Sequence, residues 1–464
     1  MSWKDEHVVV IGAARQGTAL ARYLVEQGAQ VILTDARPAE ELLTAQAELA
    51  DLPIEWVFGG HPMRLLEDAT LICPSGGVPL NIPLVHEALR EGVPLSNDSQ
   101  IFMQIVPCPV IGITGSAGKT TTTTLVGRMA EKAADAGLYR KTFVGGNIGV
   151  PLIAQIGEMT PKDIAVVEFS SFQLELMTTS PQIAAVLNIT PNHLDRHGTM
   201  QAYMDAKQNI LTYQRPGDAA VLGYEDEKAW SLANQVVDRL YTFGHQIPYG
   251  LPGTFLWNDQ IWVRTDQGDQ SVMPITEIEL VGDHNLLNVL AACAVAAAAG
   301  MPPEVMRAGV HGFGGVEHRL EFVREWGGAQ WFNDSKATSP GMTVTAMQAF
   351  REPLIVLVGG RDKDLPWDVF VNQVQTQADH VILFGEAAGK VRAAFQQAGQ
   401  KNGTNYTVDI CSGLDQAVET AAKLVHPGDV VLLAPGGTSF DEFTDYEARG
   451  RRFKELVLSL PEKE

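Results

Sequence analysis

The stretch GITGSAGKTTTTTL, residues 112–125, has the residue types of a phosphate-binding loop. An apolar segment precedes it and a helix-like segment follows, so the loop would end at a helix N-terminus, where free N–H groups and the helix dipole attract phosphate. Lys119 would neutralise charge on the β- and γ-phosphates of a nucleotide, and the Thr120 hydroxyl would bind Mg²⁺. The sequence therefore predicts a nucleotide site formed by Gly115, Ser116, Ala117, Gly118, Lys119, Thr120 and Thr121.

The loop departs from the standard pattern G-x-x-x-x-G-K-[ST], because Ile113 stands where the first glycine is expected. The alternative interpretation is a simple glycine turn whose lysine is solvated. The strand–loop–helix context favours nucleotide binding over this alternative, because such motifs act in that setting.

Two further apolar segments end in polar residues that could complete the site. Glu168 lies near the end of the stretch IAVVEF, and His193 follows AAVLNIT in the polar segment NHLDRHG. Because α/β proteins place ligands at the carboxyl ends of their strands, Glu168 could hold Mg²⁺ together with Thr120. A strand-end acid that caps the next helix is the alternative. Lys207, on the helix that follows, reads from composition as a solvated surface lysine.

Three other groups of polar residues are candidates of weaker specificity. The turn from Gly12 to Gly17, with Asp35 ending the next strand, is one glycine short of a dinucleotide fingerprint, so simple strand–helix packing fits it as well. Asn285 and Asn288 share a helix face, but their spacing alone favours a cap and a core amide. After strands of the last third come residues that could bind phosphate or carboxylate groups, or form ordinary polar loops: Arg319, Lys336, Thr338, Lys363 and Ser439.

The elements that would position these residues alternate between apolar strands and helices, which predicts an α/β protein with parallel sheets. A length of 464 residues suits about three domains. We expect a Rossmann-like N-terminal domain, a central P-loop ATPase-like α/β domain and a C-terminal Rossmann-like α/β domain. Their predicted extents are residues 1–108, 109–316 and 317–464.

Bulk composition limits the partners and the compartment. The net charge of −21 argues against a nucleic-acid partner. The four cysteines form no CxxC pair, which indicates free thiols in a reducing compartment. The first residues do not resemble a signal peptide, and no apolar run approaches about 18 residues. We therefore expect a cytoplasmic protein that does not enter a membrane.

Seven motifs, in this order, resemble the Mur ligase family over nearly the whole chain: GSAGKTT, VVEFSSFQLE, NHLDRHGTMQAYMDAK, HNLLN, HRLE, NDSKAT and SFDEFTDYEARG. NDSKAT looks like the member that adds D-glutamate, and the DNPR-type motif of the diaminopimelate-adding relative is absent from the sequence. The resemblance implies that ATP phosphorylates the carboxylate of UDP-N-acetylmuramoyl-L-alanine. The amine of D-glutamate then attacks the acyl phosphate, and a tetrahedral intermediate collapses to the amide, ADP and phosphate.

The same resemblance implies the roles of individual residues. Lys119, Glu168, His193 and Lys207 would be catalytic. Two Mg²⁺ ions would be held by Thr120, Glu168, His193 and a carbamoylated Lys207. Further ATP contacts would come from Asn285, Asn288, Arg319, Asp334 and Lys336. The UDP substrate would meet Arg15, Gln16, Asp35, Arg37, Ser75, Asn147 and His193. The D-glutamate pocket would comprise Thr338, Lys363, Ser439, Phe440 and Tyr446.

Departures from the family pattern concern fine contacts rather than the reaction class. Ala117 replaces the usual asparagine of the loop, Gly436-Gly437 lies in an unusual run, and Ser339 stands where asparagine is common. We expect a monomer acting on small-molecule substrates. The alternatives are another ligase of the family with a different amino acid, a folylpolyglutamate-synthetase-like enzyme, or a regulatory ATPase without ligase activity.

Overall fold

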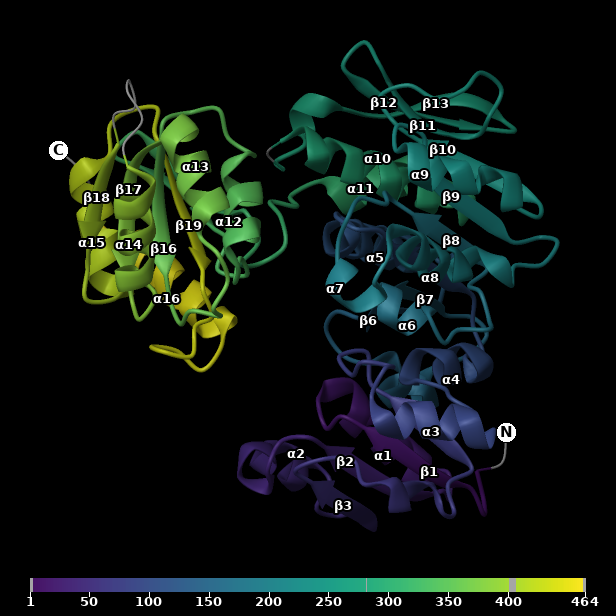
Figure 1. Cartoon of the computed structure of the whole chain (residues 1–464). Coiled ribbons are helices and arrows are strands. Elements are labelled where there is room, and N and C mark those ends of the chain that lie inside the picture. The colour runs from purple at the N-terminus through teal and green to yellow at the C-terminus, as the bar shows by residue number, and fades with distance from the viewer. Residues whose placement is uncertain (1–2, 281, 400–405, 462–464) are drawn as a thin grey trace. The chain divides into compact units, whose positions relative to one another are not determined.

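The computed structural model describes residues 3–280, 282–399 and 406–461, except for the side chains of residues 194 and 195. The chain divides into two compact units. Unit 1 comprises Met1–Ile278 with Asp283–Gly312, and unit 2 comprises Glu279–Gly282 with Phe313–Glu464. Unit 1 carries two sheets and unit 2 carries one, all of the mixed α/β kind expected (Figure 1).

The N-terminal part of unit 1 is a parallel sheet of four strands in the order β3-β2-β1-β4. The expected strand–helix–strand unit at its start is confirmed. Next to β4, Leu95 forms an isolated parallel bridge with Ile72. The elements are β1 (His7–Ile11), β2 (Gln30–Asp35), β3 (Ile54–Phe58), β4 (Leu71–Pro74), α1 (Arg15–Glu26), α2 (Leu43–Glu48), α3 (Pro83–Glu91) and α4 (Asp98–Ile105).

The central sheet has nine strands in the order β13-β12-β11-β10-β9-β8-β5-β7-β6. Strands β11 and β12 form a hairpin: Asn258 and Asp259 at its tip have φ of 50° and 56°, as a two-residue turn between antiparallel strands requires. The strands are β5 (Val110–Thr114), β6 (Thr142–Gly146), β7 (Ile164–Glu168), β8 (Ile183–Val186), β9 (Ala219–Gly223), β10 (Arg239–Phe243), β11 (Gly253–Trp257), β12 (Gln260–Thr265) and β13 (Gly268–Pro274).

The helices of the central part explain two features of the sequence. The five threonines after Lys119 lie in the first turns of a 17-residue helix, and the alanine-rich run lies in a helix whose alanines are buried. No helix in the described part of the chain is both long and apolar enough to cross a membrane. The helices are α5 (Lys119–Asp135), α6 (Ser171–Leu174), α7 (Leu194–His197), α8 (Met200–Thr212), α9 (Glu227–Ser231), α10 (Asp283–Ala298) and α11 (Pro303–Val310).

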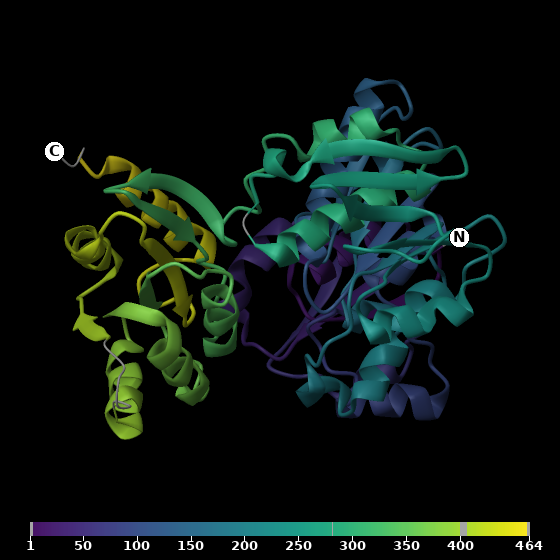
Figure 2. The same cartoon turned by 90° about the horizontal axis from the view of Figure 1, so that it is seen from above.

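Unit 2 is a six-stranded sheet in the order β14-β15-β19-β16-β17-β18, parallel except for the pair β14 and β15. Helices cover both faces of it (Figure 2). Successive strand residues point to opposite faces, so Val356 packs in one core and Leu357 in the other. The elements are β14 (Glu321–Trp326), β15 (Ala329–Asn333), β16 (Leu354–Gly359), β17 (Ala378–Phe384), β18 (Thr407–Ile410), β19 (Val430–Gly436), α12 (Pro340–Met347), α13 (Asp368–Gln377), α14 (Ala388–Ala398), α15 (Leu414–Leu424) and α16 (Tyr446–Ser459).

The central sheet positions the predicted nucleotide site. Strand β5 lies between β7 and β8, and all three are parallel. Their carboxyl ends, at Thr114, Glu168 and Val186, therefore lie at the same end of the sheet.

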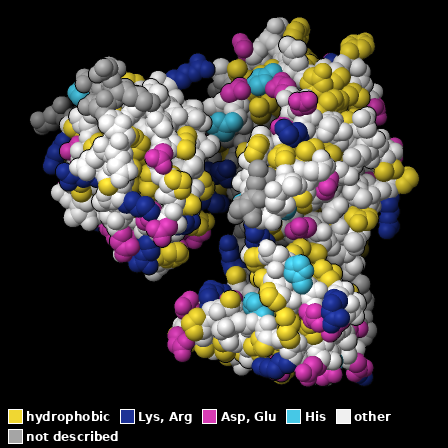
Figure 3. All heavy atoms as spheres, in the orientation of Figure 1, with side chains coloured by type: hydrophobic (Ala, Val, Ile, Leu, Met, Phe, Trp, Pro, Cys, Tyr) yellow, Lys and Arg dark blue, Asp and Glu magenta, His cyan; other side chains and the backbone are white. Residues whose placement is uncertain are grey.

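The outer strands of the same sheet carry an apolar surface, because hydrophobic side chains gather around β11 to β13 (Figure 3). The indole of Trp257 is 58% exposed there.

Candidate functional site

The predicted phosphate-binding loop joins β5 to α5 through a left-handed glycine. Gly118 has φ of 80° and directly precedes the first residue of the helix. A Cβ atom at this position would lie 2.1 Å from the Asn288 Oδ1 atom. The structure therefore brings Asn288 against the loop, and Asn288 also donates to Asn285 Oδ1 at 3.1 Å. The two amides thus lie beside the loop rather than apart from it.

Lys119 curls back over the loop that precedes it. Its Nζ atom donates to the carbonyl oxygens of Gly115 at 2.9 Å and Ser116 at 3.3 Å. A cation held at the mouth of a glycine loop attracts phosphate, and the α5 N-terminus adds to that attraction.

Glu168 ends β7 with one of its carboxylate oxygens in need of a partner. Oε1 accepts a hydrogen bond from Asn147 Nδ2 at 2.8 Å. Oε2 is buried and has no hydrogen-bond partner among the described residues. An unsatisfied buried carboxylate oxygen is costly, and a cation would satisfy it. Mg²⁺ in nucleotide sites uses one or two carboxylates plus phosphate oxygens. The lone carboxylate and the buried Thr120 in the first turn of α5 fit such an ion.

Lys207 is buried, which excludes the surface-lysine interpretation. The residue is 1% exposed, and its Nζ atom donates to Gly115 O at 2.9 Å and Thr114 Oγ1 at 3.2 Å. Burial lowers the pKa of the Lys207 amine well below its ordinary value, Lys119 lowers it further, and Glu168 opposes the shift. The amine thus lies under the phosphate-binding loop in an environment that favours its neutral form.

His193 lies on the segment that follows β8. The residue is exposed, and its backbone is in the left-handed conformation with φ of 53°. Its ring centroid is 5.1 Å from that of Phe172, which lies on α6 just after Glu168. The ring of Phe172 also stacks on the His197 ring. The Arg196 guanidinium carbon lies over the Phe172 ring, 4.1 Å from its centroid. His193 is therefore near the end of β7 and accessible to a substrate.

The predicted residues of the first sheet gather around Asp35 and Gly12. Asp35 accepts hydrogen bonds from Ala13 N at 2.8 Å and from the Arg37 side chain. Burial alone would raise the pKa of the Asp35 carboxyl, but these hydrogen bonds outweigh it and hold the pKa well below its usual range. Ser75 Oγ donates to Gly12 O at 3.1 Å. This edge offers an ionised carboxylate and a cation, which suits a polar nucleoside.

The remaining two predicted residues of the first sheet point to the central part. Arg15 donates to Gly149 O at 3.3 Å, close to Asn147 in the chain. Gln16 lies against Gly76, where a Cβ atom on that glycine would be 3.2 Å from Gln16 Oε1 and 3.6 Å from the side chain of Gln173 in α6. A ligand bound at the first sheet could therefore extend from Asp35 towards Glu168.

In unit 2, Asp334 follows the end of β15 with two cations near it. Burial raises the pKa of the Asp334 carboxyl to about 6, against the opposing charges of Arg319 and Lys336. Asp334 Oδ1 accepts from Leu320 N at 3.2 Å. The Lys336 ammonium lies 5.9 Å from the ring centroid of Tyr446. The HRLE, NDSKAT and DYEARG motifs thus meet on one side of unit 2.

The other residues predicted for D-glutamate lie after β15, β16 and β19. Lys363 Nζ donates to Thr338 Oγ1 at 3.3 Å, and Arg361 N donates to Thr438 O at 2.7 Å next to Ser439. Ser439 is buried, whereas the side chain of Phe440 is largely exposed. The lysine, a hydroxyl and these loops could receive a carboxylate.

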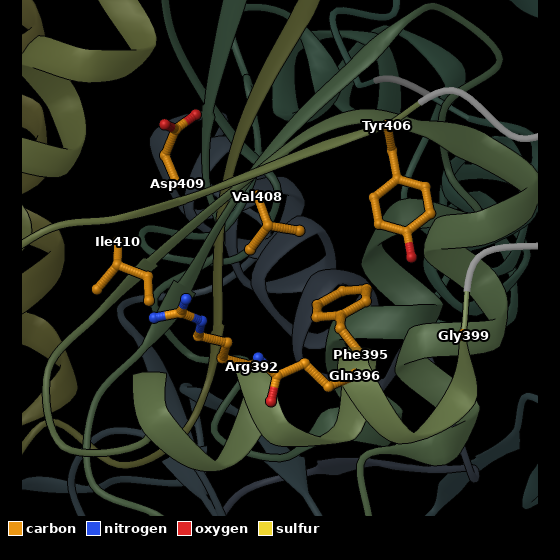
Figure 4. A pocket seen from close by; sticks show the side chains of 8 residues that line it. All are labelled: Arg392, Phe395, Gln396, Gly399, Tyr406, Val408, Asp409 and Ile410. Atoms are coloured by element: carbon orange, nitrogen blue, oxygen red, sulfur yellow. The ribbon is translucent and has the colours of Figure 1, made fainter.

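A pocket elsewhere in unit 2 contains none of the predicted residues. Figure 4 shows it between α14 and the edge strand β18. It is lined by Arg392, Phe395, Gln396, Gly399, Tyr406, Val408, Asp409 and Ile410.

Three residues that support the site had no predicted role. Asn188 hydrogen-bonds both backbone groups of Ala117. The Tyr203 hydroxyl lies 3.0 Å from Ser116 Oγ, and its ring centroid lies 4.8 Å from Lys207 Nζ. Arg449 is fully buried and donates to Ser335 O at 2.9 Å and Gly437 O at 3.2 Å.

A signal existed for two of these three residues. Tyr203 precedes Lys207 by four residues, so both lie on one helix face. Arg449 lies in the quoted motif DYEARG. Asn188 had no such signal, because one asparagine after a strand resembles an ordinary turn residue.

Three family models match the chain in order. They are the Mur ligase MurD-like N-terminal domain over residues 6–97, the Mur ligase middle domain over 113–296, and the Mur ligase glutamate ligase domain over 318–437. The matches follow the three sheets, and they confirm the expected fold of three α/β domains.

Individual relatives match over the full length. The chain is 40% identical over 457 residues to the UDP-N-acetylmuramoylalanine–D-glutamate ligase of Symbiobacterium thermophilum, covering 98% of each chain. It is 38% identical to the enzyme of the same name from Koribacter versatilis, covering all of both chains. Among solved structures, the UDP-N-acetylmuramate-alanine ligase of Thermotoga maritima aligns with a TM-score of 0.57 at 18% identity, covering 98% of this chain and 99% of that chain. The last match shows the fold alone.

Proposed function

Because the chain belongs to the Mur ligase family, we propose that it is the ATP-dependent ligase that joins D-glutamate to UDP-N-acetylmuramoyl-L-alanine in peptidoglycan precursor synthesis. The observation that carries this proposal is the full-length likeness to ligases named for D-glutamate addition. The buried, unsatisfied Glu168 oxygen beside a phosphate-binding loop supports the use of ATP.

The phosphate-binding loop of unit 1 would help to activate the alanyl carboxylate of UDP-N-acetylmuramoyl-L-alanine. Lys119 would exchange the carbonyls of Gly115 and Ser116 for the β- and γ-phosphates of ATP, and this charge would stabilise the transferring phosphoryl group. Asn285 and Asn288 would contact the nucleotide from the far side of the loop. Attack by the carboxylate of the alanyl group on the γ-phosphorus gives an acyl phosphate and ADP.

Bound Mg²⁺ would neutralise charge on the phosphates and orient them. Thr120 and Glu168 would hold one ion and His193 would help to hold a second, with Asn147 fixing the orientation of the Glu168 carboxylate. We further propose that Lys207 is carbamoylated. A neutral amine can add to CO₂, the product is an anion suited to a metal site, and its N–H could still donate to Gly115 O.

The first sheet would bind the UDP substrate through Asp35, Arg37, Arg15, Gln16 and Ser75. In unit 2, Arg319, Asp334 and Lys336 would serve ATP. Lys363 and Thr338 would pair with a carboxylate of D-glutamate, alongside Ser439, Phe440 and Tyr446. The amine of D-glutamate attacks the acyl phosphate, and the tetrahedral intermediate releases phosphate as the amide forms.

We also propose that the enzyme works as a monomer in the cytoplasm, where ATP and a UDP-linked precursor are available together. Light scattering at micromolar concentration tests the monomer, and a mass of twice the 50.3 kDa chain would contradict it.

The decisive test measures phosphate release with ATP, UDP-N-acetylmuramoyl-L-alanine and a panel of amino acids. Release that requires both the UDP substrate and D-glutamate is expected. Release with another amino acid would favour a different ligase of the family. Hydrolysis indifferent to both substrates would sink the ligase assignment in favour of a regulatory ATPase.

A further inference from the structure

The residues that follow β8 form hydrogen bonds with the phosphate-binding loop. Ser116 N donates to Asn188 O at 3.0 Å, which carries the sheet pattern one step into the loop. Ser116 Oγ donates to Thr190 O and accepts from Thr190 N, both at 2.9 Å. One short segment therefore holds the first half of the loop.

The side chain of Asn188 makes the most specific of these contacts. Its Oδ1 atom accepts from Ala117 N at 2.8 Å, and its Nδ2 atom donates to Ala117 O at 3.1 Å. Because residue 117 is alanine, it has no polar side chain with which to fix its own backbone. The carboxamide of Asn188 supplies one donor and one acceptor in the arrangement that the two backbone groups need.

This pairing sets the direction of the next peptide group. The peptide bond is planar and trans, so the C=O of Ala117 and the N–H of Gly118 point in opposite directions. With the carbonyl held towards Asn188, the Gly118 N–H is aimed away from Asn188. Gly118 then turns, in its left-handed conformation, into the first turn of α5.

We propose that Asn188 is a positioning residue for ATP, which presets the loop so that the N–H groups from Gly118 onward meet the phosphates. The inference rests on the proposed ATP site at this loop. It assigns Asn188 a role through Ala117, with no contact to ATP itself. Pre-organisation of this kind lowers the cost of ordering the loop when the nucleotide binds.

Two variants of Asn188 test the proposal in the full-length enzyme. Asn188→Leu removes both hydrogen bonds and should raise the KM for ATP about tenfold, while the KM values for the other two substrates change less than twofold. Asn188→Asp should behave similarly at about pH 8, because a carboxylate cannot donate to Ala117 O.

Two controls separate this effect from loss of structure and from failure of the ATP site. Asn209→Leu removes a hydrogen bond to Leu174 O at 3.0 Å from a similarly half-buried asparagine and should leave the ATP KM unchanged. Lys119→Ala should abolish turnover.

The proposal is overturned if either Asn188→Leu or Asn188→Asp keeps an ATP KM within twofold of wild type. If Lys119→Ala keeps normal turnover, the ATP assignment of the loop fails as well. An Asn188→Leu variant that does not fold leaves the ATP KM of Asn188→Asp as the deciding measurement.

Discussion

Replacement of Lys207 by methionine separates a catalytic role from a structural one. Methionine keeps an unbranched side chain of similar length but has neither an ammonium nor an amine that could react with CO₂. Both partners of Lys207 keep another hydrogen bond: Thr114 Oγ1 still donates to Phe169 O at 2.9 Å, and Gly115 O still accepts from Lys119 at 2.9 Å. No buried polar group is therefore abandoned.

The expected magnitudes follow from this accounting. Two lost hydrogen bonds cost about 1 kcal/mol each, but an amine no longer has to be desolvated, so the free energy of unfolding should change by about 1 kcal/mol or less. If a carbamate on Lys207 supports the metal site, turnover should fall by at least about 100-fold, since even partners of metal ligands are worth 10–100-fold.

The assay combines urea denaturation, phosphate release and ¹³C NMR. Wild-type enzyme supplied with ¹³C-bicarbonate should show a carbamate carbon signal, and Lys207→Met should lack it while remaining folded. In CO₂-depleted buffer the wild type should lose activity and regain it with bicarbonate. Near-normal turnover of Lys207→Met would refute the metal-site reasoning. A carbamate signal that persists in the variant would place the modification on another lysine.

Three further predictions concern other parts of the molecule. Asn147→Leu should raise the Mg²⁺ concentration for half-maximal activity about tenfold, because Asn147 orients Glu168; a change only in the KM for the UDP substrate would indicate direct substrate contact instead. Lys363→Ala should raise the KM for D-glutamate about 10–100-fold with the ATP KM unchanged, as loss of a charged hydrogen bond predicts; equal effects on both KM values would argue against this role. Burial raises the pKa of Asp98 from 3.8 to about 6, so its folded state binds more protons in that window and stability falls as pH rises through it. In urea denaturation, the free energy of unfolding of Asp98→Asn should exceed that of the wild type by up to about 3 kcal/mol at pH 8 and match it near pH 4. A difference in unfolding free energy that does not depend on pH would exclude titration of Asp98.

Local patterns predicted the loop and the strands well, because these depend on neighbouring residues. The glycines and Lys119 identified the loop, and alternating apolar segments identified the parallel sheets. Strand β3, with the sequence IEWVF, was missed because its mixed pattern suits an edge strand with little burial. Lys207 read as a surface residue because nothing in its own helix shows that the loop after β5 covers it. Burial of that kind is a property of packing between distant segments.

The strand order explains why one asparagine reaches the loop and another does not. The spatial order of the four strands β5, β6, β7 and β8 is β8-β5-β7-β6. The chain therefore forms β6 and β7 on one side of β5 and then crosses to the other side to form β8. In open α/β sheets such a reversal opens a crevice at the carboxyl ends of the central strands. Asn188, two residues past the end of β8, therefore lies beside the loop after β5, whereas Asn192 is exposed four residues farther on. The sequence pattern indicated the polar motif around His193 and missed Asn188, which the topology places in contact with the loop.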